Sequence, residues 1–559
     1  MKLKYTLTLI CSLFIYAGFS QIHLSTMVWS AEGTEIISDA KRYDDGSIYV
    51  AGRFTEATDF DHSDAEVILE PIGVIDVYVA KYSHFGELIW VHSFGAVGEA
   101  QNKLQMQLDD EGNAFLSGVF DGEVDFDFSA EEYVLDGNNE VYLLKINADG
   151  EFQFAYEFNV YEGPMQLDKE GNVLMVGQFF GIKDFNPGAE EFYLDNEDGN
   201  RYFLKLNNAG EFVWAKNVGE SENPFFVDDI GVNSNNEIYL TGNFTDTLFY
   251  VVDGTENYSV NEDVYGIGLI KYDSDAEILW GGALLGEGAN YATDIAIDRD
   301  DNIIIGGLFT EELDFDFGAG ATIETVENRA MYIQKLSSDH ELLWYGIMPT
   351  NGSITNCYFN GIVTDQYNDI YFAGDIATDF IDFDPGVGTD NRSSWDDQAD
   401  AFFGKWSADG TYIWAKTIGR VGNDRANSIF LDEVGTIYLA GGFSDNCDFD
   451  PNDGTYFIDA LGYPDGYLSR YYQGLTGIEP TPVFDGLSVY PNPTAGTFTI
   501  SGLTAGDQVE VYSLNGELLI QNQAMNINHE ISLAHLADGV YLVKVVNKAS
   551  SRMVKVVKG

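Results

Sequence analysis

The stretch Ile437-Tyr438-Leu439-Ala440-Gly441-Gly442-Phe443 decides the fold, because a closely similar stretch occurs seven times in the chain. Each copy is a short run of β-forming residues ending in glycine, and the copies begin 59 to 67 residues apart. A β-rich period of this size is typical of one supersecondary unit that is repeated in space. The key glycines of the copies are Gly52, Gly118, Gly177, Gly242, Gly307, Gly374 and Gly441.

Each repeat predicts four strands. In the sixth repeat, the apolar runs 362–364, 370–374, 401–406 and 411–416 are separated by turns rich in Asp, Asn and Gly. Such runs, bounded by turn residues, are the signature of strand–turn–strand units, and no segment shows a sustained helical period. Seven repeats of four strands predict an all-β fold: a seven-bladed β-propeller over residues 21–473.

The two ends of the repeat region predict how the propeller closes. The fourth strand of most repeats carries a tryptophan, but the seventh repeat stops after its third strand, near Tyr471. A matching piece, Met27-Val28-Trp29, stands alone before the first repeat. We expect this N-terminal strand to complete the last blade and so to remove the exposed sheet edges.

A basic residue recurs on the third strand of every repeat. In a chain of net charge -63, this regularity indicates a structural role, such as pairing with a nearby Asp or packing of the side-chain stem. The residues are Lys81, Lys145, Lys205, Lys271, Lys335, Lys405 and Arg470.

Residues 1–20 read as a secretory signal peptide. Lys2 and Lys4 precede an apolar run, residues 7–19, that is too short to span a membrane, and small residues follow it. We therefore expect Sec export, a mature chain that begins at Gln21 and no transmembrane segment. The two remaining cysteines, Cys357 and Cys447, do not constitute a disulfide framework, and whether they pair is left open.

The composition and the strand pattern of the chain change after the repeats. Residues 474–484 resemble a linker, and residues 485–559 predict seven short strands, the pattern of a small Ig-like β-sandwich. Residues 21–484 carry 21 Lys and Arg against 85 Asp and Glu, whereas residues 485–559 carry 5 against 6. Such different surfaces predict two separate domains.

The C-terminal segment resembles a known family. The stretch Val489-Tyr490-Pro491-Asn492-Pro493-Thr494 and the later Gly539-Val540-Tyr541-Leu542-Val543-Lys544 are similar to the type A C-terminal sorting domain of type IX secretion cargo. The resemblance implies that the type IX machinery is a partner and that the protein is secreted, or attached to the outer surface, of a Bacteroidetes-type bacterium. It also implies a sorting motif made of Tyr490, Pro491, Asn492, Pro493, Gly539 and Tyr541. The repeats look like those of bacterial surface β-propellers.

A second motif, Asp-Phe-Asp or Asp-Phe-Asn, follows the second strand of six repeats. In an extended segment its two polar side chains point to one side and the phenylalanine to the other. Either the phenylalanine anchors the loop, or the carboxylates bind calcium, which takes six to eight oxygen ligands. The candidate calcium ligands are Asp59, Asp61, Asp125, Asp127, Asp314, Asp316, Asp382, Asp384, Asp448, Asp450 and Asp453.

No catalytic motif occurs in the sequence, and the negative charge argues against nucleic acid as a partner. The sequence therefore favours a binding or interaction module, with an extracellular carbohydrate or a protein as the ligand. A carbohydrate-active lyase or hydrolase with its site in the propeller axis is the alternative, and a purely structural surface protein is a third class. A ligand site must use residues that break the repeat. The two irregular segments, residues 246–265 and 390–400, are expected to be long surface loops, and they offer Tyr250, Tyr258, Arg392 and Trp395.

Overall fold

The computed structural model describes residues 18–558 apart from residues 64, 96–103, 219–224, 253, 319, 351–355, 379, 396–397, 453, 477–487, 491–493, 495, 502, 504–507, 514–517, 525–527, 537–538 and 547–550. Every regular element in this part of the chain is a β-strand, and none of its elements is a helix that could cross a membrane. Most of the predicted signal peptide lies outside the described residues. Two compact units are present, residues 19–474 and a second that contains residues 475–559.

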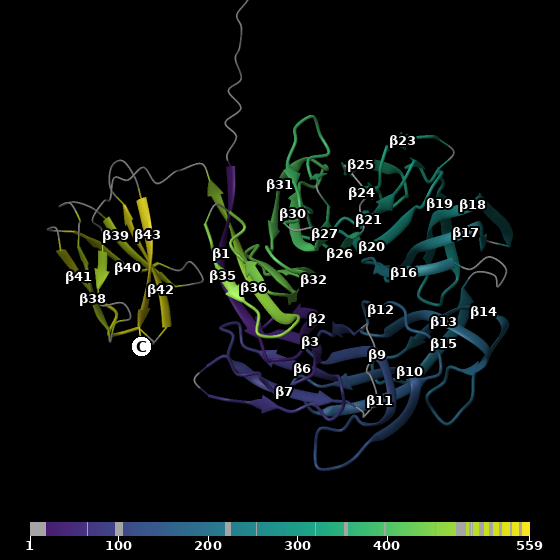
Figure 1. The fold of residues 1–559 in the computed structure, drawn as a ribbon, viewed down its shortest axis with the longest axis horizontal. Coiled ribbons are helices and arrows are strands. Elements are labelled where there is room, and N and C mark those ends of the chain that lie inside the picture. The colour runs from purple at the N-terminus through teal and green to yellow at the C-terminus, as the bar shows by residue number, and fades with distance from the viewer. Residues whose placement is uncertain are drawn as a thin grey trace, which may run out of the picture. The chain divides into compact units, whose positions relative to one another are not determined.

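The larger unit consists of seven four-stranded antiparallel sheets, numbered 1 to 7 here (Figure 1). Sheet 1 consists of β2 (Glu35–Arg42), β3 (Ile48–Phe54), β6 (Asp76–Tyr82) and β7 (Leu88–Phe94). Sheet 2 consists of β8 (Gln105–Leu108), β9 (Ala114–Asp125), β10 (Val134–Ile146) and β11 (Phe152–Phe158). Sheet 3 consists of β12 (Met165–Leu167), β13 (Val173–Asp184), β14 (Tyr193–Leu206) and β15 (Phe212–Val218). Sheets 4 and 5 are β16 (Phe225–Val232), β17 (Ile238–Val252), β18 (Thr255–Tyr272) and β19 (Ile278–Leu284); and β20 (Tyr291–Ile297), β21 (Ile303–Phe309), β24 (Ala330–Leu336) and β25 (Leu342–Pro349). Sheets 6 and 7 are β26 (Asn356–Thr364), β27 (Ile370–Ala377), β30 (Asp400–Trp406) and β31 (Tyr412–Ile418); and β32 (Arg425–Leu431), β33 (Ile437–Phe443), β36 (Asp465–Thr476) and β1 (Gly18–Trp29).

The first strand of each sheet, which we call its inner strand, contacts the inner strand of the next sheet. These contacts run from β2 through β8, β12, β16, β20, β26 and β32, and they return from β32 to β2. Short two-stranded ribbons extend four of the sheets beyond their second strand: β4 (Thr58–Asp59) with β5 (Ile68–Leu69), β22 (Glu312–Asp314) with β23 (Ile323–Thr325), β28 (Ile381–Asp382) with β29 (Asn391–Arg392), and β34 (Asn446–Asp448) with β35 (Phe457–Asp459).

The key glycines allow the inner strand to approach the second strand. A Cβ atom added to Gly441 would lie 1.9 Å from the Arg425 carbonyl oxygen, and one on Gly374 would lie 1.9 Å from the Tyr358 oxygen. The register shifts immediately beside these contacts, at a β-bulge in the inner strand. The repeated glycine therefore exists because only a residue without a side chain fits next to the bulge.

Side chains of the inner strands bind the backbone of the next sheet. Asp39 Oδ2 accepts the Met106 N–H at 3.1 Å, and Asp229 Oδ2 accepts the Ile295 N–H at 3.0 Å. Asn427 Nδ2 donates to the Ile37 carbonyl at 2.8 Å and thus connects sheet 7 to sheet 1. Each bond provides a hydrogen-bond partner for a backbone N–H or carbonyl group of the neighbouring sheet. These bonds hold one sheet against the next.

The recurrent basic residue connects sheets at the opposite ends of the strands. Lys335 Nζ forms an ion pair of 2.8 Å with Asp298 of its own sheet and donates to the Ala408 carbonyl of the next sheet. The indole of Trp344 donates to the same carbonyl at 3.1 Å. Sheets 1 and 3 bind the Ala148 and Ser274 carbonyls in the same way. The predicted structural role of the third-strand basic residue is thus confirmed.

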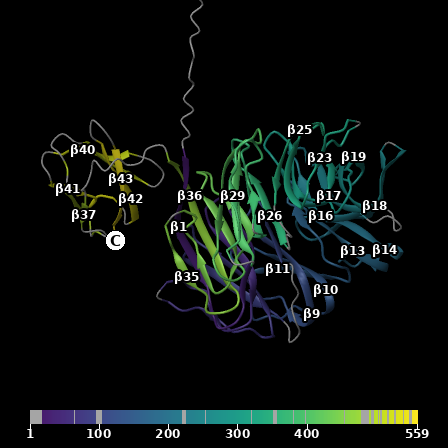
Figure 2. The same cartoon turned by 45° about the horizontal axis from the view of Figure 1, so that its top comes forward.

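Sheet 7 is assembled from both ends of the repeat region, as the sequence predicts. Strand β1 lies beside β36 in Figures 1 and 2 and forms the fourth strand of this sheet. Trp29 is fully buried, and its indole donates to the Tyr82 hydroxyl of sheet 1 at 3.0 Å. In this sheet no turn joins the third strand, β36, to the fourth strand, β1, because the two strands come from opposite ends of the repeat region. Accordingly, Trp414 Nε1 of sheet 6 is buried without a hydrogen-bond partner among the described residues.

The described residues of the C-terminal unit form seven strands in two sheets, which agrees with the predicted strand number. One sheet is β37 (Ser488–Tyr490), β38 (Thr497–Ser501) and β41 (Asn528–Ser532), and the other is β40 (Leu518–Gln523), β39 (Gln508–Ser513), β42 (Gly539–Val546) and β43 (Ser551–Lys558). Phe498 and Ile531 of the first sheet share one buried cluster with Val511 and Val543 of the second. The two sheets therefore pack face to face around an apolar core.

The first prediction concerns closure of sheet 7. Trp29→Ala should lower the free energy of unfolding by about 3–5 kcal/mol, because it removes a buried indole and leaves a cavity. Trp395, which is 69% exposed, provides the matched control, and Trp395→Ala should change stability little. Denaturant melts of both variants measure the difference. Equal stability of the two variants would contradict the assigned role of β1.

The second prediction concerns Glu35, which lies at the junction of sheets 1 and 7 and is fully buried. Burial, together with the nearby Asp465, raises its carboxyl pKa from 4.5 to about 7. Between these values the folded state binds more protons than the unfolded state, so stability falls as the pH rises. Glu35→Gln should reduce this slope and raise the melting temperature at pH 8, whereas the exposed Glu66→Gln should not. Identical pH profiles for wild type and Glu35→Gln would refute the assignment.

Candidate functional site

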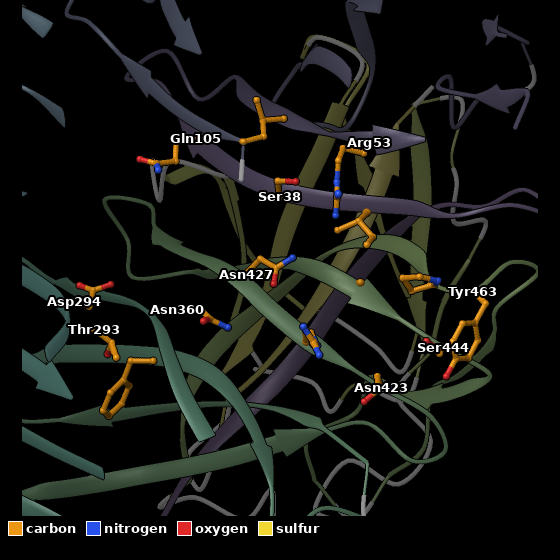
Figure 3. A pocket seen from close by; sticks show the side chains of 16 residues that line it. Ser38, Arg53, Gln105, Thr293, Asp294, Asn360, Asn423, Asn427, Ser444 and Tyr463 are labelled. Carbon is orange, nitrogen blue, oxygen red and sulfur yellow. The ribbon is translucent and has the colours of Figure 1, made fainter. Parts of the chain in front are cut away.

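A cavity of about 590 Å³ lies among the inner strands, at the ends where the second strands finish (Figure 3). Its wall draws on sheets 1, 2, 5, 6 and 7, and we call it the inner cavity. The polar residues that line it are Ser38, Arg53, Gln105, Thr293, Asp294, Asn360, Asn423, Arg425, Asn427, Ser444 and Tyr463.

The β-bulges place polar side chains in this wall. Ser38, Thr293, Asn360 and Asn427 are each the extra residue of an inner-strand bulge, in sheets 1, 5, 6 and 7. A bulge redirects the side chain of the inserted residue, and here it redirects four polar side chains toward one space. The backbone feature is repeated, but the residue at the position varies from sheet to sheet.

The amide side chains of the cavity are held in fixed positions. Asn360 Nδ2 donates to Asp375 Oδ1 at 2.6 Å and to the Ala426 carbonyl at 3.0 Å. Gln105 accepts the Met165 N–H at 2.9 Å and donates to the Gly163 carbonyl at 3.1 Å. Because these groups are already oriented, a ligand would lose little free energy in ordering them.

Two carboxylates near the cavity have perturbed pKa values. Burial raises the pKa of Asp229 to about 6, and burial together with the charge of Asp229 raises that of Asp294 well above its ordinary value. Asp294 lies deep in the protein yet keeps part of its surface open to the cavity. Lys41 moderates both shifts and forms an ion pair of 3.2 Å with Asp39. Asp294 is the member of this pair that lines the cavity.

Aromatic residues lie near the start of four inner strands, in sheets 3 to 6. Each pairs across the strands with the residue that follows a key glycine, and these pairs are Tyr161–Gln178, Phe226–Asn243, Tyr291–Leu308 and Tyr358–Asp375. Tyr161, Phe226 and Tyr358 are 55%, 37% and 40% exposed. In sheets 1 and 7 the same register position holds the pairs Ile36–Arg53 and Arg425–Gly442. We call Tyr161, Phe226, Tyr291 and Tyr358 the aromatic rim.

A second cavity, of about 490 Å³, opens among the turns at the other ends of the inner strands. Two of its basic residues are paired with carboxylates: Arg42 binds Glu433 through two bonds of 2.8 and 3.1 Å, and Lys405 lies 2.7 Å from Asp369. The bulges that direct polar side chains into the inner cavity make that cavity the stronger candidate for a ligand site.

The Asp-Phe-Asp loops show a repeated hydrogen-bond pattern. All six phenylalanines are fully buried, which confirms their anchoring role. The first aspartate of each loop accepts two backbone N–H groups; Asp448 Oδ1, for example, accepts those of Asp450 and Tyr456 at 3.1 and 2.7 Å. The second aspartate, such as Asp450, accepts one more.

These loops were tested for their fit to calcium. Among the described residues, no group of three His, Cys, Asp or Glu side chains could hold a metal ion, and Asp453 lies outside them. Five of the motifs offer two carboxylates and the motif at Asp184 offers one, so calcium would need further oxygens, such as backbone carbonyls. Calcium binding stays a prediction.

The two irregular segments differ in their relation to the inner cavity. Residues 246–265 were expected as a long loop, but most of them extend the hairpin of β17 and β18, and Tyr250 packs half-buried against Gly281. Tyr258 lies on β18, and its side chain is outside the described residues. Arg392 pairs with Asp390 at 2.9 Å. Trp395 is exposed, and Ala399, further along its loop, donates to the cavity residue Asn423.

Sequence reasoning missed the cavity residues Arg53, Arg425, Asn360 and Asn427, because they stand inside repeated strands. The available signal was variation at one position of a regular repeat. The residue after the key glycine is Arg53 in sheet 1 but Val119, Leu308 or Gly442 in others.

In the C-terminal unit, Tyr490 ends β37, Gly539 begins β42, and Tyr541 is buried on β42. Pro491, Asn492 and Pro493 lie outside the described residues. Cys357 and Cys447 of the larger unit are both buried free thiols.

The third prediction separates the two interpretations of the Asp-Phe-Asp loops. Asp448→Ala should lower the free energy of unfolding by about 1–3 kcal/mol, because it leaves two backbone N–H groups without an acceptor. The loss should be the same in calcium and in excess chelator. Asp448→Asn, which keeps an acceptor oxygen, is the control and should lose less. If chelation lowered the melting temperature of the wild type but not of Asp448→Ala, calcium would be the correct interpretation.

Comparison with known proteins identifies the C-terminal segment. Residues 488–559 match the family model described as the secretion system C-terminal sorting domain. A curated relative, an uncharacterized WD repeat-containing protein of Acanthamoeba polyphaga mimivirus, is 21% identical over an alignment of 351 residues, and the match covers 52% of this chain and 25% of that protein. The chain thus spans about a quarter of the length of that relative.

Two solved structures align with much of the chain. PorZ, a bacterial surface component of the type IX secretion system of Porphyromonas gingivalis, aligns over 94% of this chain and 81% of its own, with 12% identity and a TM-score of 0.22. A protein of unknown function from Dyadobacter fermentans aligns over 81% of this chain and 100% of its own, with 11% identity and a TM-score of 0.34. The match of residues 488–559 confirms the predicted resemblance: the chain carries a C-terminal sorting domain of the type IX secretion system, and the protein is secreted or attached to the outer cell surface.

Proposed function

We propose that the seven sheets are the blades of a closed seven-bladed β-propeller over residues 21–473, joined by residues 474–484 to an Ig-like sandwich over residues 485–559. The cycle of contacts among the inner strands supports closure, and so does the sharing of sheet 7 between β1 and β36. Closure removes the free sheet edges that a secreted all-β protein would otherwise expose.

We further propose that the propeller is an extracellular binding module whose ligand enters the inner cavity. The observation that carries this proposal is the set of polar side chains from four bulges, held in place and directed into one space of about 590 Å³. This volume is within the usual range for small-molecule sites. Amide and hydroxyl groups suit a ligand rich in hydrogen-bonding groups, such as a carbohydrate or a peptide.

A carbohydrate-active enzyme is the second candidate function. The observation in its favour is the pair Asp229 and Asp294, whose pKa values are raised by burial and, for Asp294, also by the charge of its partner. Asp294 lines the cavity, and a carboxyl group kept protonated by its surroundings can act as the general acid in glycoside cleavage. Turnover of a bound oligosaccharide that Asp294→Asn abolishes, while binding remains, would favour the enzyme.

The fourth prediction tests the cavity. A Cβ atom on Gly442 would meet its nearest neighbour at 3.5 Å, so a side chain can be added there with little strain. Gly442→Tyr should fill part of the inner cavity, preserve the melting temperature and abolish binding to an array of neutral and acidic extracellular glycans and peptides. Val387→Tyr places the same side chain on an exposed loop and is the control. Unchanged binding by Gly442→Tyr would exclude the cavity as the site.

The fifth prediction concerns export. We propose that residues 485–559 act as an address that is not needed by the propeller, and that residues 1–20 direct Sec export. A chain without residues 485–559 should fold with the same melting temperature but remain in the periplasm. Fractionation and surface proteolysis measure its location, and normal surface delivery would contradict the role.

A further inference from the structure

We propose that the inner cavity binds an acidic saccharide, with the sugar carboxylate held by Arg53 and Arg425 and a sugar ring stacked on the aromatic rim. This inference rests on the proposed binding function and adds the chemical class of the ligand.

The two arginines reverse the local charge of a strongly acidic unit. Residues 21–484 hold 85 acidic and 21 basic side chains, yet two arginines line one cavity. Only one acidic residue, Asp294, is among the described residues of the lining, and burial favours its neutral form. The acidic surface around such a cationic site repels anions in general. An anion therefore binds there only if it also makes specific contacts inside the cavity.

The arginines come from neighbouring sheets. Arg53 lies on β3 of sheet 1, Arg425 on β32 of sheet 7, and β2 of sheet 1 contacts β32. Gly442, which also lines the cavity, stands opposite Arg425 on the neighbouring strand and adds no side chain. Figure 3 shows Arg53 extending from its strand toward Asn427 across the cavity. Two guanidinium groups around one space are suited to a planar carboxylate, which arginine can bind through two parallel bonds.

The carboxylates near Arg425 do not account for it. Asp375 is buried, and burial raises its pKa even though the charge of Arg425 acts in the opposite direction. Its Oδ1 accepts the Asn360 amide at 2.6 Å. No nitrogen of Arg425 lies within 4.0 Å of an acidic oxygen in the described part of the chain, so a ligand carboxylate would add a contact rather than displace one.

The aromatic rim favours a saccharide over an acidic peptide. Tyr291 and Tyr358 stand two residues before Thr293 and Asn360, which line the cavity. Phe226 occupies the equivalent register position in sheet 4, where the Arg201 guanidinium lies 4.3 Å from the centroid of its ring. Aromatic side chains offer flat apolar faces with polar tips, which match the apolar face and hydroxyl edge of a sugar ring. The fixed amides of Gln105 and Asn360 suit hydroxyl groups, whereas peptide side chains would require deeper apolar pockets.

Isothermal titration of the mature full-length protein tests the inference. The probes are a trigalacturonate, the neutral galactotriose and an acidic tripeptide of equal charge. The acidic sugar should bind at least about tenfold more tightly than the neutral one, and Arg53→Gln or Arg425→Gln should weaken it by about 10–100-fold, the usual range for a charged hydrogen bond. Binding of the neutral sugar should hardly change. Arg299→Gln, in the second cavity and outside the lining of the inner cavity, is the control.

The outcomes separate this inference from the proposed function. Equal binding of the acidic and neutral sugars, sensitive to Gly442→Tyr, would overturn the carboxylate assignment and leave the binding module intact. Preference for the peptide, lost in Arg425→Gln, would overturn the saccharide. Binding that Gly442→Tyr does not affect would overturn the proposed site itself. Phe226→Ala should weaken both sugars alike, and no effect on either would remove the rim from the site.

Discussion

The structure depends on one constraint: each sheet completes its polar contacts only with the sheet that follows it. At one end of the strands, inner-strand side chains such as Asp39 and Asn427 bind the neighbouring backbone. At the other end, a lysine and a tryptophan share one turn carbonyl of the next sheet. A buried carbonyl or N–H without a partner is costly, so neither sheet of a pair is complete alone. This interdependence explains why the repeat keeps a basic residue in a chain with so few of them.

The same feature that fastens the sheets also creates the cavity. The key glycine and the bulge opposite it bring two strands together and insert one residue into the inner strand. The backbone of the bulge is common to five sheets, whereas the inserted side chain is free to differ. The fold and the candidate function therefore depend on neighbouring residues with separate requirements. The glycine is required because a Cβ atom there would lie about 2 Å from a carbonyl oxygen, whereas the residues beside it vary.

Much of the fold could be predicted from the sequence because it depends on local patterns that recur with the period of the repeat. The glycine period gave the seven units, Trp29 marked the missing strand, and the third-strand lysines indicated their ion pairs. The hairpin extension at residues 246–265 was mistaken for a loop, since its polar composition hides a strand that gains its hydrogen bonds only from its partner. The cavity residues could not be predicted, because the convergence of Arg53 and Arg425 depends on contact between sheets 1 and 7, which are far apart in the chain. The Asp-Phe-Asp motif also holds its loop through backbone hydrogen bonds that the sequence does not reveal.

The shared sheet 7 has a consequence for how the chain folds. Sheets 1 to 6 are each made of strands that follow one another closely, so they can form from local contacts. The pairing of β1 with β36 instead joins residues more than 400 positions apart. Long-range contacts form slowly, because the chain must lose the entropy of closing a large loop before it gains the pairing energy. The first strand of the unit is therefore among the last to acquire its partner, and until then the edge of β36 stays open to pairing with another chain.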